Sequence, residues 1–498
     1  MKTKKSLLNF LTDVIPLLIV SFLGIFKLKF FVQYLGDDTL GLYQLFSQIM
    51  VYISLVDGGL TSAVLYSLYK PNKNKDEKSI SKIIAASKKT FSLIGALVFF
   101  LAFIVSFFAH YFIKDCTFSA NYVGLTFILF SISNVINYFF VPYQVLLEVK
   151  EKKYITNLCV QIGQIILSVT EIIMLINGVN FISILLMHSI VKLIANIIQA
   201  IICHKVIKDI DYKEKEKDYS FTNQIKDLLV HKINGLIGSN IDVVIISSFM
   251  GLSWVAIYSV YYYIYNMIKT IIGKISGSII AIVGNQSVNN NKRSYEIYKE
   301  LNSFLFFVGI SICVPLYLAI NYFINIWYEN AISTTNFIAI CFSILLFVFT
   351  IKLPTTTYIT SNGLFKETKK CATIDMLTNL ILSLILVNFF GIPGVLLATI
   401  FSMFVSEYIY KTIILYKNVF KRDYMKYFVY NLKFFGVFVI DLIVGILIIN
   451  QISIDSIITW FGIFIIYTTL NSLIILLVFN ILKEAEFINR VKRLIKGD

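Results

Sequence analysis

The sequence predicts an all-α polytopic membrane protein with about 14 transmembrane helices. Of its 498 residues, 57% are hydrophobic and only 15% are charged, and the mean hydropathy is +0.78. The apolar residues form runs of about 20 residues or more, the length that an α-helix needs to cross a bilayer. These runs lack the two-residue alternation of barrel strands. Composition, run length and periodicity therefore all indicate membrane helices.

Each expected span is one long apolar run between polar segments. In chain order the spans are 9–34, 39–68, 84–112, 122–147, 154–177, 180–205, 227–250, 254–283, 301–325, 334–359, 371–390, 393–416, 433–450 and 456–482. Every connecting loop is short, so no soluble catalytic domain is expected on either face.

Charges divide between alternate loops. One set of loops holds basic segments such as "KPNKNKDEKSISK" and "HKVIKDIDYKEKEKDYS", and the other set contains a single cation, Lys114. By the positive-inside rule, both termini are expected in the cytoplasm. The net charge of +15 is thus a topology signal, and nucleic-acid binding is not expected. The six cysteines are scattered without a CxxC pair, so we expect no disulfide framework, no metal site and no cofactor.

An internal repeat divides the chain. "YLGDDTLGLYQLF" and "FMGLSWVAIYSVY" align at a constant shift of 215, which pairs Gly36 with Gly251 and Tyr43 with Tyr258. We therefore expect an N-lobe over 1–212 (helices 1–6), a C-lobe over 213–418 (helices 7–12) in pseudo-twofold repeat, and two extra helices with a cytoplasmic tail over 419–498. Parallel repeats of this kind occur in transporters and enclose a central site.

Polar side chains recur at helical spacing along 254–283 and at the repeat-equivalent positions of 39–68. The first seam contains Tyr258, Tyr262, Tyr265, Asn266, Lys269, Gly273 and Ser276, and the second contains Tyr43, Ser47, Ser54, Gly58 and Thr61. Such seams are expected to line a water-filled cavity between the lobes, where tyrosine rings can stack on sugars.

Ionisable residues inside spans are costly and mark functional sites. The cations are Lys27, Lys29, Lys192, Lys232, Lys269, Lys274, Lys352 and Lys411, and the acids are Asp57, Glu171, Asp242, Asp375, Glu407 and Asp441. Geometry accounts for some of them. Lys232 and Asp375 lie near cytoplasmic ends and can snorkel, while Glu407 and Lys411 have the i, i+4 spacing of a structural pair.

Four of these lysines are predicted cavity cations: Lys27, Lys29, Lys269 and Lys274. Lys27 and Lys269 are the main candidates, and Lys29 lies closer to the outer end of its span. Two acids, Asp57 and Asp242, are candidate counter-ions or ion-coupling sites. His188 is interpreted as a packing or polar contact.

The segment "YLGDDTLGLYQLFSQIMVYISLVDGGLTSAVLYSLYK" resembles the start of polysaccharide flippases of the multidrug/oligosaccharidyl-lipid/polysaccharide exporter superfamily. The length, the fourteen spans and the two lobes plus two helices agree, so the resemblance covers the whole chain. It implies a transporter, not an enzyme, in a bacterial inner membrane. The implied activity is movement of polyprenyl-pyrophosphate-linked oligosaccharides for cell-surface polysaccharide such as O-antigen or capsule.

The resemblance also implies intramembrane cations on the first and eighth helices, where Lys27, Lys29, Lys269 and Lys274 lie. Lysine replaces the family's more usual arginine, which keeps the charge but not the bidentate grip on phosphate. H⁺ or Na⁺ as counter-ion and the glycan polymerase machinery are further expected partners. Two alternatives stay open: a cation-coupled drug or metabolite antiporter of the same superfamily, and a membrane glycan polymerase or glycosyltransferase.

Overall fold

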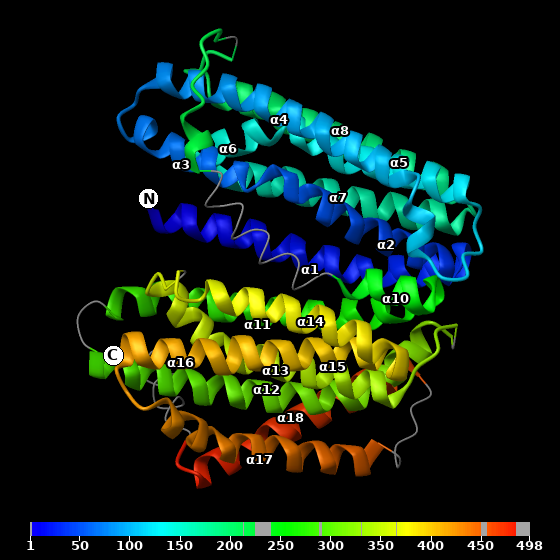
Figure 1. Ribbon diagram of the computed structural model, residues 1–498, viewed down its shortest axis with the longest axis vertical. Coiled ribbons are helices and arrows are strands. Elements are labelled where there is room, and N and C mark those ends of the chain that lie inside the picture. The colour runs from blue at the N-terminus through cyan, green and yellow to red at the C-terminus, as the bar shows by residue number, and fades with distance from the viewer. Residues whose placement is uncertain are drawn as a thin grey trace. The chain divides into compact units, whose positions relative to one another are not determined.

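The computed structural model describes residues 2–212, 214–224, 241–287, 291–329, 331–364, 366–449 and 456–484. Within these ranges the regular structure is helical and contains no strand (Figure 1). The predicted all-α polytopic class is confirmed. The described chain divides into two compact units, residues 1–256 and 257–498. The predicted lobe boundaries at residues 212 and 418 stay predictions.

The first unit contains the helices that precede residue 257. They are α1 (Lys2–Leu35), α2 (Asp37–Ile53), α3 (Leu60–Lys73), α4 (Glu77–Ser106), α5 (Ala120–Val135), α6 (Val141–Val149), α7 (Lys153–Ile176), α8 (Phe181–Val206), α10 (Asp242–Met250) and the start of α11 (Leu252–Ser287). Within the unit, α1 packs along α7, α7 and α5 both pack on α8, and α4 packs on α5. This arrangement places polar positions of α1, α7 and α8 next to one another.

The second unit contains the rest of α11 and the later helices. They are α12 (Asn291–Trp327), α13 (Asn336–Ser361), α14 (Lys369–Phe390), α15 (Ile392–Met403), α16 (Lys411–Leu415), α17 (Tyr424–Ile449) and α18 (Ile457–Ile481). π-Helical segments, Phe404–Tyr410 and Tyr416–Phe420, flank α16. Helix α12 packs against α13, α17 and α18, and α14 packs against α15.

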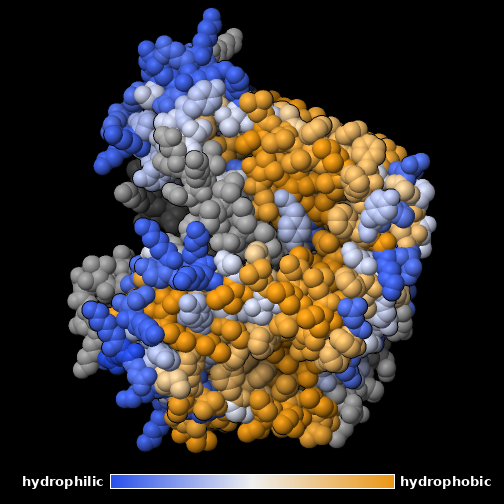
Figure 2. Space-filling view, in the orientation of Figure 1, coloured by the Kyte–Doolittle hydropathy of each residue, from blue (hydrophilic) through white to orange (hydrophobic). Residues whose placement is uncertain are grey.

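Eleven segments of the described chain are long and apolar enough to cross a membrane, and each overlaps one predicted span. The long helices α1 and α11 have 34 and 36 residues and cover two more predicted spans. Predicted span 227–250 lies mostly outside the described residues, and only α10 of it is seen. In both units hydrophobic residues cover the length of the helices while hydrophilic residues gather toward their ends (Figure 2).

Two glycines paired by the repeat adopt the same backbone conformation. Gly36 has φ 84° and ψ 163°, and Gly251 has φ 95° and ψ 178°. Both directly precede a helix, α2 or α11. Because L-residues rarely adopt such positive φ values, glycine is required at both positions. Two positions paired by the constant shift of 215 thus share one backbone conformation, and the repeat as a whole stays a prediction.

Within the predicted span 39–68 the helix breaks in the middle. Helix α2 ends at Ile53, a 3₁₀ turn covers Ser54–Asp57, and Gly58 and Gly59 have φ of 57° and 81° before α3 begins. Asp57 Oδ1 accepts a hydrogen bond from the Gly59 backbone N–H (3.0 Å). Two consecutive glycines with left-handed dihedrals end a helix. The repeat-equivalent Gly273 lies inside the continuous helix α11.

Candidate functional site

A buried charged group lies in the first unit where α1, α7 and α8 meet. Lys27 Nζ of α1 is 3.0 Å from Glu171 Oε2 of α7. The same Glu171 oxygen is 3.0 Å from His188 Nε2 of α8. Glu171 is fully buried, and 18% of the Lys27 side chain is exposed. We call Lys27, Glu171 and His188 the N-unit triad.

Pairing explains how these groups tolerate their position. A charged side chain inside a membrane span costs several kcal/mol unless it is paired or hydrated. Here the Lys27 ammonium and the Glu171 carboxylate neutralise each other, and the imidazole of His188 adds a third polar partner. The ring of Tyr43 on α2 completes the surroundings, with Lys27 Nζ 5.1 Å from its centroid and His188 packed edge-on against it. The triad is thus fixed by four helices.

A second charged group lies in the second unit. Glu407 in the π-helical segment contacts Lys411 at i, i+4, as the sequence predicted, and it also lies 3.4 Å from Lys352 Nζ of α13. Lys269 Nζ of α11 lies 5.3 Å from the centroid of the Phe349 ring, and Lys352 Nζ lies 5.5 Å from the same centroid. We call Lys269, Lys352, Glu407 and Lys411 the C-unit cluster. It holds three lysines and one glutamate, so its summed charge is positive.

A π-helical turn positions Glu407. Such turns are rare and occur frequently at functional sites, because the extra residue per turn shifts the side chains that follow. The same segment brings Ser406 Oγ within hydrogen-bond distance of Asp375 Oδ1 on α14 (2.9 Å). Asp375, predicted to snorkel, is held by this bond. Both acids of this region therefore have protein partners.

The tyrosines of the predicted seam differ in exposure. Tyr258 is buried and its ring is stacked on that of Tyr262 at 5.5 Å, while Tyr262 is half-buried. Asn266 is exposed. Tyr43 and Ser47 on α2 are half-buried. Some of these residues are thus packed inside their own unit and others reach its surface. Their role in lining a cavity stays a prediction.

Other predicted residues lie at helix breaks or helix ends. Ser54 donates its hydroxyl to the Val51 carbonyl (2.7 Å), next to the break that Asp57 caps. Asp242 is buried at the first turn of α10. Lys29 and Lys274 are half-buried. Among the described carboxylates, the one within 4 Å of Lys27 is Glu171 rather than the expected Asp57 or Asp242.

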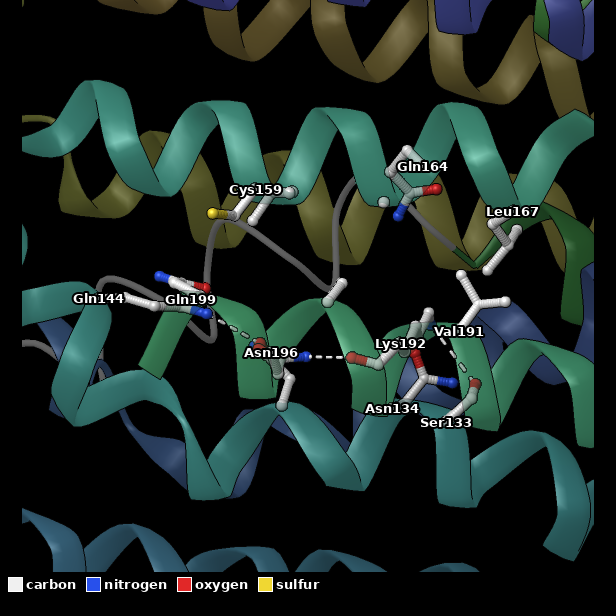
Figure 3. A pocket seen from close by; sticks show the side chains of 14 residues that line it. Ser133, Asn134, Gln144, Cys159, Gln164, Leu167, Val191, Lys192, Asn196 and Gln199 are labelled. Carbon is white, nitrogen blue, oxygen red and sulfur yellow. Dashed lines mark hydrogen bonds between the residues drawn. The ribbon is translucent and has the colours of Figure 1, made fainter. Parts of the chain in front are cut away.

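A polar cavity of about 370 Å³ lies between α5, α6, α7 and α8, wholly inside the first unit. Six of its lining side chains are carboxamides: Asn134, Asn137, Gln144, Gln164, Asn196 and Gln199. Lys192 is its cation, and Nζ of this residue lies 3.4 Å from Ser133 Oγ (Figure 3). The residues that line the cavity include no acid.

Solved structures similar to this chain include a lipid II flippase and multidrug transporters. The chain superposes on "Lipid II flippase MurJ, inward closed conformation" with a TM-score of 0.74 and 19% identity, covering 94% of this chain and 98% of that one. It superposes on an inward-facing multidrug resistance MATE family transporter of the MOP superfamily with a TM-score of 0.66 and 13% identity, covering 82% and 98%. A Vibrio cholerae MATE transporter in the bent form gives 0.55 and 11%, with 84% and 98% covered. The chain has the MurJ/MATE fold.

At this level of identity the similarity concerns the fold alone. No family model matches the sequence. No curated protein matches it either. The fold alone therefore does not identify the functional residues, and the side chains of this chain must.

Sequence reasoning missed the partners of Lys27. Glu171 was visible as an acid inside span 154–177, and His188 as an imidazole inside span 180–205. Within one helix, spacing predicts contacts, as it did for Glu407 and Lys411. The contact between α1 and α7 depends on how two distant helices pack, and no local pattern encodes that. Lys192 lies one helical turn after His188. As a cation inside a predicted span, it was visible in the sequence as a candidate site residue.

Proposed function

We propose that this chain is a flippase that moves polyprenyl-pyrophosphate-linked oligosaccharide repeat units across the cytoplasmic membrane by alternating access, for cell-surface polysaccharide assembly. The observation that carries this proposal is the excess of lysine over acid among the charged groups inside the spans. The C-unit cluster has three lysines to one glutamate, and the cavity of the first unit has Lys192 among the residues that line it and no acid. Such surroundings suit an anionic substrate.

Electrostatics favours this substrate class. A pyrophosphate carries negative charge, and ammonium groups in a partly dehydrated cavity attract it more strongly than they would in bulk water. Lys27 is held by Glu171 at 3.0 Å. When the site is empty, Lys27 and Glu171 neutralise each other. In the proposed mechanism, Lys27 leaves Glu171 and binds a substrate phosphate. An interior-negative potential drives the anion outward by about 2.3 kcal/mol per charge per 100 mV if the charge crosses the whole field.

The fold similarity supports the transporter class more broadly. One structure with this fold is described as a lipid II flippase. We propose the bacterial inner membrane as the location, both termini in the cytoplasm, and H⁺ or Na⁺ exchange through Asp57 or Asp242. We also propose that the glycan polymerase machinery receives the product. The predicted cations Lys27, Lys29, Lys269 and Lys274 are proposed substrate-binding residues, with Lys29 secondary.

The second candidate is a drug or metabolite antiporter, because two of the superposed structures are MATE transporters. An antiporter for cationic drugs requires acids that attract its substrate. The buried Glu171 is paired with Lys27, so this candidate, like the flippase mechanism, requires that pair to open.

Loss of surface glycan tests the proposed function. Cells that depend on this chain should lose surface glycan with Lys27→Ala or Lys269→Ala while the protein level in the membrane stays normal. Full glycan display by both variants would overturn the assignment of these cations. Unchanged glycan in cells without the chain, together with new sensitivity to cationic drugs, would favour the antiporter.

A further inference from the structure

The carboxamide-lined cavity in the first unit has a chemistry that the proposed pathway between the lobes does not use. Figure 3 shows Gln144 and Gln199 at one end, Lys192, Asn134 and Ser133 at the other, and Gln164 facing them from α7. All the lining residues lie between Ser133 and Gln199. The cavity is therefore built by one unit alone.

Its carboxamides keep hydrogen-bonding capacity. Asn134 donates to the Phe130 carbonyl (3.1 Å), Asn196 to the Lys192 carbonyl (2.9 Å) and Gln199 to Thr156 Oγ1 (3.2 Å). Each of these bonds uses one of the two N–H donors of an amide and leaves its oxygen available. Among the described residues, the side chain of Gln164 makes no hydrogen bond. Paired donors and acceptors of this kind match hydroxyl groups, each of which also donates and accepts.

The charge of the cavity selects against cations. No acid lines the cavity to balance Lys192. An anionic group on the ligand would supply the missing counter-charge.

The depth of the cavity indicates a transported ligand. Lys192 is the twelfth of the 26 residues of α8, so about 17 Å of helix lie on one side of it and about 21 Å on the other. Amides and an ammonium at mid-helix are costly inside a bilayer unless water or a polar ligand fills the space. Substrate sites of transporters lie near the bilayer midplane.

We propose that this cavity binds the glycosyl phosphate part of the substrate, with the carboxamides on sugar hydroxyls and Lys192 on the phosphate. The inference rests on the proposed function for the identity of the substrate. The cavity is the site that distinguishes a sugar-bearing head from other anions. Its volume of about 370 Å³ falls in the range of small-molecule pockets.

Cys159 provides the assay because it lines the cavity and is half-buried. Cys116 is the other half-buried cysteine, and the remaining four are buried. In the full chain carrying Cys116→Ser, thiol modification therefore reports on Cys159. The rate of its modification by a methanethiosulfonate reagent is measured with glucose 1-phosphate, N-acetylglucosamine 1-phosphate, glucose or inorganic phosphate. At ten times the dissociation constant, a bound sugar phosphate slows modification about tenfold.

The expected result is protection by a sugar phosphate at lower concentration than by glucose or phosphate alone. Lys192→Gln should raise the half-protecting concentration about tenfold or more. The matched control Lys89→Gln removes an exposed charge from α4 of the same unit and should change nothing. Equal protection by inorganic phosphate would reduce the cavity to an anion site and overturn the proposal. Absence of protection by both sugar phosphates would also overturn it.

A cellular measurement separates this inference from the proposed function. If cells without the chain lose surface glycan but Lys192→Gln restores it fully, the flippase function stands and the cavity proposal fails. If cells without the chain keep their glycan, the flippase function fails, and the protection of Cys159 alone decides what the cavity binds.

Discussion

Asp38 accepts a hydrogen bond from Ser253, its repeat equivalent 215 residues later, with 2.6 Å between Oδ1 and the serine Oγ. Its second oxygen, Oδ2, accepts one from Thr117 Oγ1 (2.9 Å). Beside them Gly41 of α2 lies against the backbone of Leu252, the first residue of α11. The first turns of α2 and α11 are therefore joined at equivalent positions of the two repeats.

Removing the Asp38 carboxylate should loosen this junction. In Asp38→Ala, both hydroxyl groups lose their acceptor, and we expect faster hydrogen exchange of the backbone amides at residues 252–256 without global unfolding. Asp37→Ala is the matched control, because Asp37 bonds the neighbouring Asp38 amide only. Equal exchange in both variants would mean that the Asp38 bonds contribute nothing to the junction.

Gly41 should not tolerate a larger side chain. A Cβ atom at this position would lie 2.1 Å from the Leu252 carbonyl oxygen, a backbone atom that cannot rotate away. We expect Gly41→Ala to lower the free energy of unfolding by about 1–3 kcal/mol, the cost of overpacking. The control Gly462→Ala places its methyl in open space within α18. A melting temperature for Gly41→Ala equal to that of the control would contradict the close approach.

Neutralising the charges of the N-unit triad one at a time and together separates their effect on stability from their effect on transport. Lys27→Gln leaves Glu171 buried without its cation, and breaking a buried pair costs about 3–5 kcal/mol. The double variant Lys27→Gln with Glu171→Gln removes both charges, so we expect its melting temperature to recover toward that of the native chain. Surface glycan should remain absent in the double variant. Recovery of both stability and glycan would reduce the pair to a structural role.

The segment that follows α8 should loosen in acid. Outside the spans, the hydrogen bond and charge of Lys82 lower the pKa of Glu216 from its usual value. A lowered pKa contributes stability that is present above the unfolded value of about 4.5 and is lost as the pH falls through the folded value. Proteolysis at residues 207–219 should therefore rise below about pH 4, and less so in Lys82→Ala, which lacks the contact already. An identical pH profile in native chain and variant would contradict the role of this pair.

Local patterns predicted the helices of this fold and some of its contacts. Gly36 and Gly251 could be paired by a constant shift because both need a positive φ. The pair of Glu407 and Lys411 followed from spacing within one helix. The contact of Lys27 with Glu171, and the assembly of carboxamides from α5 to α8 into one cavity, depend on helix packing between distant segments. The helix break at Gly58 was missed because an apolar run continues through it, although two adjacent glycines were its signal.

Reconstituted transport tests the central claim most directly. Purified full-length chain in proteoliposomes is given a labelled polyprenyl-pyrophosphate-linked oligosaccharide, and the appearance of the glycan in the opposite leaflet is followed with a membrane-impermeant glycosidase. We predict that the native chain moves the glycan, that Lys27→Ala and Lys269→Ala do not, and that Lys89→Ala does. No movement by the native chain, with uptake of a cationic drug by the same proteoliposomes, would contradict the account.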